Sequence, residues 1–280
     1  MIGIGKIFKL PLIYLNMVKT IGILSLKGGV GKTSSVVSLG AALSEFGKKV
    51  LLVDGNFSAP NLGIHLNLLN PDRHMHQVME RIINPKQAIH SLDHFDVIPA
   101  DVHGDKIKDP LKLRDRLKNI KRSYDYVLID SSPALNEETL ATMLASDHLF
   151  VVTTPDYATL SMTLKAIKLA QQRGTRIDGL ILNRVYDKNF ELSLEDIERT
   201  SEVPVLAVIP HDVGVPEAQA NFISSLEHNP NSEGSEEYRR LAAALSGEKP
   251  KKAKLRKFFK WVSPSKQEVN RTVFYNRVFD

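Results

Sequence analysis

At 280 residues, with 42% hydrophobic and 25% charged residues, the chain has the composition of a soluble globular protein of one or two domains. It contains no cysteine, which excludes disulfides, thiolate zinc sites and cysteine-held iron–sulfur clusters. The net charge of +5 is uneven, because residues 249–280 carry ten Lys or Arg and two Asp or Glu, whereas residues 1–248 carry 27 and 30. Any anionic partner is therefore expected at the C-terminal segment.

The first 16 residues are apolar with two lysines and no acidic residue. A signal peptide is disfavoured because no small-residue cleavage site follows. A transmembrane span is disfavoured because Lys6, Lys9 and Pro11 interrupt the run of about 20 apolar residues that a span requires. Two interpretations stay open: residues 1–17 touch a membrane or a partner, or translation starts at Met17.

The glycine-rich stretch KGGVGKT at residues 27–33 follows a predicted strand at 20–25 and opens a predicted helix at 34–46. This order points backbone N–H groups and the positive helix end at one place, which suits the phosphates of a nucleotide. Lys32 is expected to reach the β- and γ-phosphates, and the Thr33 hydroxyl to bind Mg²⁺. The residues expected to contact ATP here are Lys27, Gly28, Gly29, Val30, Gly31, Lys32, Thr33 and Ser34.

A second apolar run, residues 49–54, reads as a buried parallel strand. It delivers residues 54–61 to the carboxyl edge of the sheet, where doubly wound folds bind their ligands. This segment is therefore expected to face the γ-phosphate, with Asp54 as a candidate Mg²⁺ ligand.

Between residues 62 and 122 the sequence predicts one or two short helices at 62–94, a strand at 95–99 and a charged amphipathic helix at 108–122. His90 and His94 have the i, i+4 spacing of a metal pair, but no Glu or Cys completes a ligand set, so a metal site there is disfavoured.

The run at 124–130 ends at Asp130 and is followed by Ser-Ser-Pro, which has the shape of a Walker B strand. Asp130 is expected to hold Mg²⁺, and the turn at 131–133 to sense the γ-phosphate. Further strands are predicted at 149–154, 179–184 and 205–209, with helices at 158–173 and around 239–241. This alternation predicts one doubly wound, mostly parallel α/β sheet with helices on both faces, as in P-loop NTPases.

The loop at 27–33 fits K-G-G-x-G-K-[ST] but has Leu26 where the simple P-loop has its first glycine. In this, and in its D-S-S-P turn, the chain resembles the deviant Walker A ATPases, MinD, ParA and their relatives. The resemblance covers about residues 18–245 and is nearest to archaeal-type MinD. It implies ATP and Mg²⁺ as cofactors and a homodimer closed by ATP, in which Lys27 reaches the phosphates of the opposite subunit.

The resemblance also assigns roles to residues at three strand ends. Asn183 matches the asparagine that recognises adenine, although it could instead cap a loop, and Pro210 borders the base. Asn56 stands where the family usually has an aspartate that positions the attacking water. Because an amide cannot accept a proton as a carboxylate does, the rate of hydrolysis is in doubt while nucleotide binding is not.

Residues 249–262 combine seven basic residues with an apolar stripe at i, i+3, i+4 and i+7. A basic amphipathic helix of this kind suits an anionic bilayer surface, and it resembles the membrane-targeting tail of MinD. Nucleic acid or a protein partner are the alternatives. The residues expected to touch the membrane are Leu255, Phe258, Phe259, Trp261 and Val262. A second apolar set, expected to dock on a partner, consists of Val273, Phe274, Tyr275 and Phe279.

The predicted organisation is an N-terminal extension (1–17), an ATPase domain (18–246) and a basic linker and tail (247–280). The predicted function is a slow, partner-stimulated ATPase that cycles between the cytoplasm and the inner face of the membrane and positions an unidentified protein at a division site or at polar or motility machinery. The alternatives are a ParA-like ATPase that uses DNA as its matrix, and a nucleotide switch that hardly hydrolyses because of Asn56.

Overall fold

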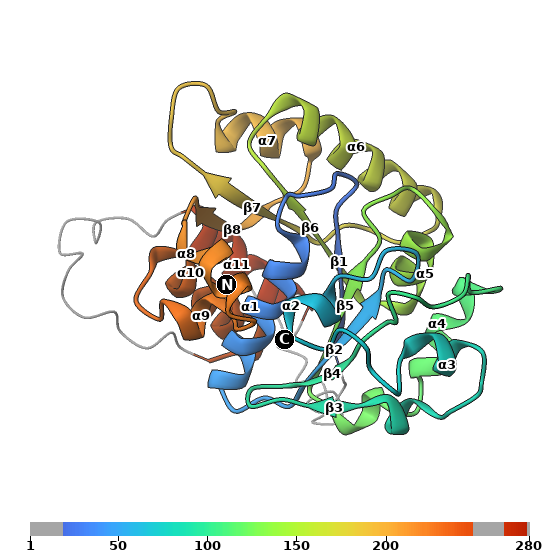
Figure 1. The fold of residues 1–280 in the computed structure, drawn as a ribbon. Coiled ribbons are helices and arrows are strands. Elements are labelled where there is room, and N and C mark those ends of the chain that lie inside the picture. The colour runs from blue at the N-terminus through green and yellow to red at the C-terminus, as the bar shows by residue number, and fades with distance from the viewer. Residues whose placement is uncertain (1–18, 249–265, 279–280) are drawn as a thin grey trace, which may run out of the picture.

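One sheet organises the structure, a computed structural model that describes residues 19–248 and 266–278 (Figure 1). Its strands are β1 (Lys19–Leu24), β2 (Val50–Gly55), β3 (His90–Ser91), β4 (Asp96–Ile98), β5 (Tyr126–Ser131), β6 (His148–Thr153), β7 (Gly179–Val185) and β8 (Val205–Pro210). They lie in the order β3-β4-β2-β5-β1-β6-β7-β8, all parallel except the antiparallel pair β3 and β4. The predicted fold class is confirmed.

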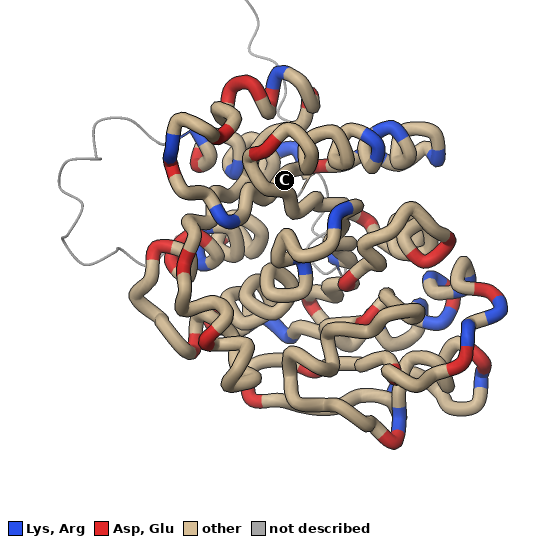
Figure 2. Tube along the Cα trace, turned by 45° about the horizontal axis from the view of Figure 1, so that its top comes forward, with Lys and Arg blue, Asp and Glu red and all other residues tan. Residues whose placement is uncertain are grey.

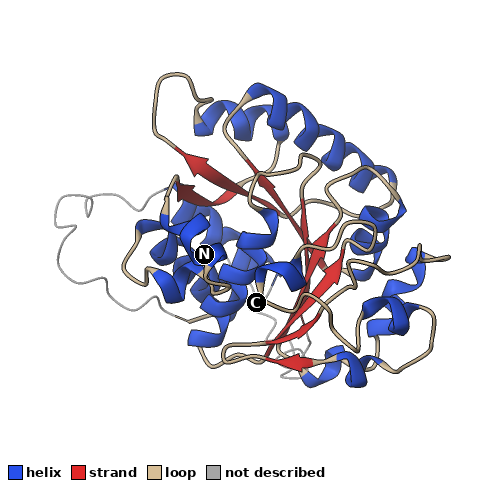
Figure 3. Cartoon of the chain, in the orientation of Figure 1, coloured by secondary structure: helices blue, strands red, loops and turns tan. Residues whose placement is uncertain are grey.

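Helices cover both faces of this sheet (Figure 3). One face carries α1 (Lys32–Glu45), α9 (Ser225–His228), α10 (Glu233–Ser246) and α11 (Lys266–Val278), and the other carries α4 (Leu113–Leu117), α5 (Glu137–Ala145), α6 (Tyr157–Gln172) and α7 (Leu194–Ser201). The other helices are α2 (Leu62–His65), α3 (Met75–Met79) and α8 (Gly214–Ala220). Successive strand side chains point to opposite faces, so the apolar runs of the central strands fill both layers.

The segment before β4 contains the two short helices predicted at 62–94, α2 and α3, but it ends in the strand β3. His90 lies on the short strand β3 and His94 in the turn before β4, so the two histidines do not share a helix. His90 Nε2 lies 2.8 Å from the Arg73 carbonyl oxygen, and His94 Nε2 lies 3.6 Å from a carboxylate oxygen of Glu227. Among the described residues no group of three or more His, Cys, Asp or Glu could hold a metal ion.

The charged helix predicted at 108–122 is also wrong. Only the five residues of α4 are α-helical, with 3₁₀ turns at Pro110–Lys112 and Lys121–Ser123 on either side. Leu113, Leu117 and Ile120 are nevertheless buried. The apolar side chains of this segment are thus buried against α5 although no continuous helix forms.

The C-terminal helix α11 packs on β8 and α10 of its own chain. Phe274 is 2% exposed, and its ring centroid lies 5.5 Å from that of Phe150 in β6. Arg271, 3% exposed, donates to a Glu237 carboxylate oxygen at 2.7 Å and to the Leu206 carbonyl oxygen at 2.7 Å. The expectation that Phe274 docks on a partner is therefore wrong, because it lies in the core of this chain.

The described residues contain no helix that is long and apolar enough to cross a bilayer. Lys and Arg are interspersed with Asp and Glu along the described chain (Figure 2). The five apolar residues predicted to touch a membrane, at 255–262, lie outside the described residues.

Candidate functional site

The loop between β1 and α1 has the backbone that its glycines predict. Gly29 and Gly31 adopt φ values of 76° and 88°, in the left-handed region that side chains disfavour. A Cβ on Gly31 would overlap the Asn183 amide, whereas a Cβ at Gly28 or Gly29 would meet nothing within 4 Å. The loop is therefore packed on one side and open on the other, as a phosphate cradle requires.

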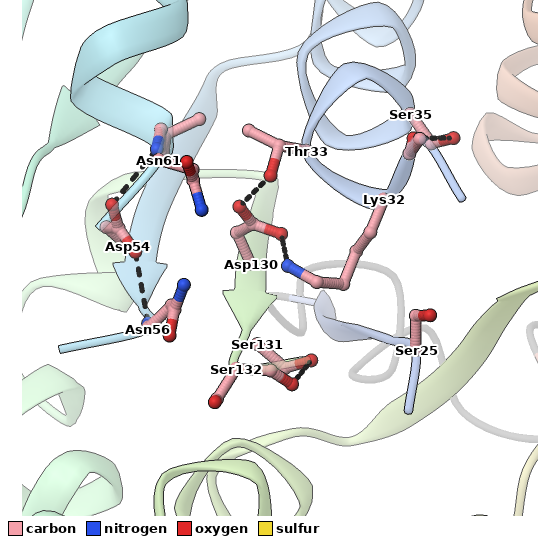
Figure 4. Close-up of polar contacts among 12 residues, drawn as sticks. Ser25, Lys32, Thr33, Ser35, Asp54, Asn56, Asn61, Asp130, Ser131 and Ser132 are labelled. Carbon is pink, nitrogen blue, oxygen red and sulfur yellow. Dashed lines mark hydrogen bonds and ion pairs between the residues drawn. The ribbon is translucent and has the colours of Figure 1, made fainter. Parts of the chain in front are cut away.

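Lys32 and Thr33, at the start of α1, both meet Asp130 at the end of β5 (Figure 4). The Lys32 ammonium pairs with one oxygen of this carboxylate, and the Thr33 hydroxyl donates to the other at 2.7 Å. Asp130 is fully buried and Lys32 is 7% exposed. A hydroxyl and a carboxylate on neighbouring elements are oxygen ligands of the type that Mg²⁺ prefers, so Thr33 and Asp130 fit that ion.

Asp54, on the neighbouring strand, is also fully buried and is paired with Asp130 in the strand register. Its two oxygens accept the backbone N–H groups of Asn56, at 3.0 Å, and Leu62, at 3.1 Å. Burial and the charge of Asp130 raise the pKa of Asp54 to about 7. Asp54 thus holds the loop between β2 and α2, and its role as a Mg²⁺ ligand stays a prediction.

Asn56, which is expected to orient the attacking water, follows the end of β2 directly. It is 1% exposed, and its Nδ2 donates to the Ala59 carbonyl oxygen. Its Oδ1 is buried without a partner among the described residues. The amide therefore has one fixed end and one free acceptor, which can receive a hydrogen bond from water but cannot take its proton.

The Lys27 side chain reaches the start of α6. Its Nζ donates to the Thr159 hydroxyl at 2.7 Å and lies 3.5 Å from Asp156 Oδ1, while 42% of its side chain is exposed. Burial would raise the pKa of Asp156, but hydrogen bonds from Thr154 and Thr159, with the charge of Lys27, lower it to about 2. Lys27 is thus held at the rim of the site by an ionised, partly exposed partner.

The two residues expected near the base lie on neighbouring strands. Asn183 in β7 is 9% exposed and donates from Nδ2 to the Val30 carbonyl oxygen at 2.7 Å. Pro210 ends β8 opposite Val185. Asn183 is therefore fixed against the phosphate loop, and its contact with adenine stays a prediction.

Known proteins share this fold. The septum site-determining protein MinD of Pyrococcus horikoshii, solved as a complex with Mg-ADP, is 31% identical with a TM-score of 0.75, covering 81% of this chain and 95% of that one. Residues 18–181 match the family described as an AAA domain. The chain belongs to the MinD/ParA family of P-loop ATPases.

Other relatives show the same degree of similarity. An uncharacterized ATP-binding protein of Methanocaldococcus jannaschii is 34% identical, over 81% of this chain and 88% of that protein. The chromosome partitioning protein ParA of Caulobacter vibrioides is 31% identical, over 85% of this chain and 98% of that protein.

The structure adds contacts that the sequence did not predict. Asp156 and Thr159 receive Lys27 from about 130 positions away in sequence, at separations of 129 and 132. Glu138, in the first turn of α5, receives the Ser58 amide and hydroxyl. Neither pairing has a local motif, since both depend on strand order and not on spacing along the chain.

Proposed function

We propose that this protein is an ATP-dependent dimerising switch of the MinD type, which hydrolyses ATP slowly and moves between the cytoplasm and an anionic membrane surface to position a protein partner. The observation that carries the proposal is the convergence of Lys32, Thr33 and Asp130 on one open glycine loop, with the buried Oδ1 of Asn56 free beside it. These groups supply a positive charge, ligands for Mg²⁺ and an acceptor for a hydrogen bond from the attacking water.

In the hydrolysis step, groups of the chain position the phosphates and the attacking water and neutralise negative charge. Lys32 and the loop amides hold the β- and γ-phosphates, and Asn56 orients the attacking water through Oδ1. Thr33 and Asp130 would hold Mg²⁺, which would supply positive charge next to the transferring phosphoryl group. Because Asn56 accepts no proton, turnover is slow.

The same edge of the sheet favours a second copy of the chain. Lys27 is partly exposed at this edge. The apolar side chains of Leu135 after β5 (59%), Tyr157 after β6 (79%) and Phe190 after β7 (75%) are exposed there as well. In the proposed dimer, Lys27 leaves Asp156 for the phosphates of the opposite subunit. The apolar residues around it become buried, which stabilises association.

Membrane residence would follow from dimerisation. A single short apolar face binds lipid weakly, whereas two faces held together bind by avidity. α10 ends at Ser246 and α11, packed on the domain, begins at Lys266. The proposed membrane segment therefore joins two docked helices, and a test must alter it in place because truncation also removes α11.

The first test is steady-state ATP turnover of wild type and Asn56→Asp, with and without anionic liposomes. Slow wild-type turnover is expected to rise with lipid, and Asn56→Asp to raise it at least about tenfold by supplying a proton acceptor. Asn61→Asp, an exposed position in the same loop, controls for the added charge. Wild type that binds ATP without turnover in any condition would make the protein a nucleotide-dependent binding switch.

The second test is ATP-dependent pelleting with anionic liposomes. A variant with Leu255, Phe258 and Phe259 replaced by serine is expected to stay in the supernatant, while Val269→Ser/Val273→Ser, at exposed positions of α11, still pellets. Equal pelleting of both variants would count against the membrane role. Retention on DNA in place of lipid would support the ParA-like alternative, which the similarity to ParA favours.

A further inference from the structure

The loop between β2 and α2 is held by one side chain of β2 and one side chain of α5. The β2 residue, Asp54, accepts the backbone amide of Asn56 at the start of the loop and that of Leu62 at its end. In its middle, the Ser58 amide donates to Glu138 Oε1 at 3.0 Å and the Ser58 hydroxyl donates to the same oxygen. Glu138 is therefore the side chain that ties the middle of this loop to α5.

Glu138 is the buried one of the two charged residues of α5. It is 7% exposed, and its second oxygen, Oε2, is buried without a partner among the described residues. Its neighbour Glu137, in the same first turn, is exposed. A buried carboxylate is costly unless hydrogen bonds compensate it, and here both of those bonds come from Ser58.

The first turn of α5 is also bonded to the turn that follows β5. Asn136 Nδ2 donates to Ser132 Oγ at 3.1 Å, and Thr139 Oγ1 donates to the Ser132 carbonyl oxygen at 3.0 Å. Glu138 lies between these two residues in sequence. One helical turn thus joins the segment after Asp130 to the loop that carries Asn56.

The orientation of Asn56 depends on that loop. The two ends of an amide differ, so its oxygen must face water while its nitrogen faces away. The Ala59 carbonyl oxygen fixes the nitrogen, and Ala59 follows Ser58 directly. A displaced Ser58 moves Ala59 and lets the Asn56 amide rotate.

We propose that Glu138 is a positioning residue for ATP hydrolysis, which acts through Ser58 and Ala59 to hold Asn56 Oδ1 toward the attacking water. The proposal rests on the proposed function. It assigns Glu138 no contact with substrate, and it makes the first turn of α5 the link between the two loops that face the γ-phosphate.

The test compares kcat and KM for ATP in wild type, Glu138→Ala, Glu138→Gln and the control Glu137→Ala. Glu138→Ala is expected to lower kcat about tenfold with KM unchanged, because misplacement of a positioned group affects the reacting geometry more than binding. Glu138→Gln retains part of the rate, since its amide oxygen still accepts from Ser58 but more weakly. Glu137→Ala is expected to match wild type.

A double-mutant cycle separates positioning from a general loss of structure. In an Asn56→Ala background, Glu138→Ala is expected to change kcat less than twofold, because the group that it positions is gone. Hydrogen exchange of the Ser58 amide, measured without nucleotide, gives a readout independent of turnover. Faster exchange is expected in Glu138→Ala and not in Glu137→Ala.

The outcomes are distinguishable. Unchanged kcat in Glu138→Ala, an equal loss in both backgrounds, or Ser58 exchange that matches wild type would each overturn the role of Glu138 while leaving the ATPase intact. Absence of turnover in wild type would overturn the proposed hydrolysis, and with it the catalytic part of this proposal. The exchange experiment would still decide whether Glu138 holds the loop.

Discussion

Replacement of Lys32 by alanine is expected to lower ATP turnover at least about 100-fold, which corresponds to about 2.7 kcal/mol of transition-state stabilisation. Lys32 pairs with Asp130, and Asp130 and Asp54 are both fully buried. Without this cation the phosphates lose a partner and two neighbouring carboxylates lose their neutralising charge. ATP affinity, measured with a fluorescent nucleotide, is expected to fall together with turnover.

Loss of Lys32 also breaks a buried ion pair, which costs about 3–5 kcal/mol of folding free energy in comparable cases. Circular dichroism and chemical unfolding of Lys32→Ala must therefore accompany the kinetics. Lys48→Ala is the matched control, because Lys48 pairs with Glu248 at 3.5 Å, away from the phosphate loop. Turnover of Lys32→Ala within threefold of wild type, in a folded protein, would contradict the assignment of the phosphate site.

Replacement of Phe274 by alanine is expected to lower the free energy of unfolding by about 3–5 kcal/mol, the range for a buried phenylalanine. Phe274 is 2% exposed against Phe150, whereas its neighbour Val273 is 58% exposed. Val273→Ala is therefore expected to change stability by less than about 0.5 kcal/mol. Urea unfolding of the full-length variants measures both.

The comparison tests whether α11 is part of the folded domain in solution. Equal, small effects at positions 273 and 274 would mean that α11 does not dock on β8 and α10. A large effect at Phe274 alone would support the docked helix. It would also predict that truncation of the C-terminus destabilises the domain, independently of any membrane contact.

The position of the glycine loop between a strand and a helix was predictable because its determinants are local. A glycine loop between a strand and a helix fixes Lys32 and Thr33 within a few residues of one another. The strands that end at Asp54 and Asp130 are recognisable as apolar runs, and parallel strands bring their carboxyl ends to one edge. Asn56 stands out for the same reason, as an amide at a strand end where the resemblance implies a carboxylate.

The partners of these residues were not predictable in the same way. Lys27 was expected to serve the phosphates, and only the neighbouring placement of β1 and β6 shows that Asp156 receives it within the chain. Glu138 had no motif, since a glutamate in a first helical turn usually lies in solvent. The apolar residues of the charged run at 108–122 had helical spacing, yet only the short helix α4 forms there.

The sequence by itself determined the alternation of strands and helices, the nucleotide loop and the basic character of the C-terminal segment, because propensity, periodicity and composition act along the chain. Only the tertiary structure decided that Phe274 and Arg271 belong to the core, and that Glu138 reaches Ser58 across 80 positions. Burial and the pairing of polar groups depend on which elements pack against each other, and local sequence does not specify that packing.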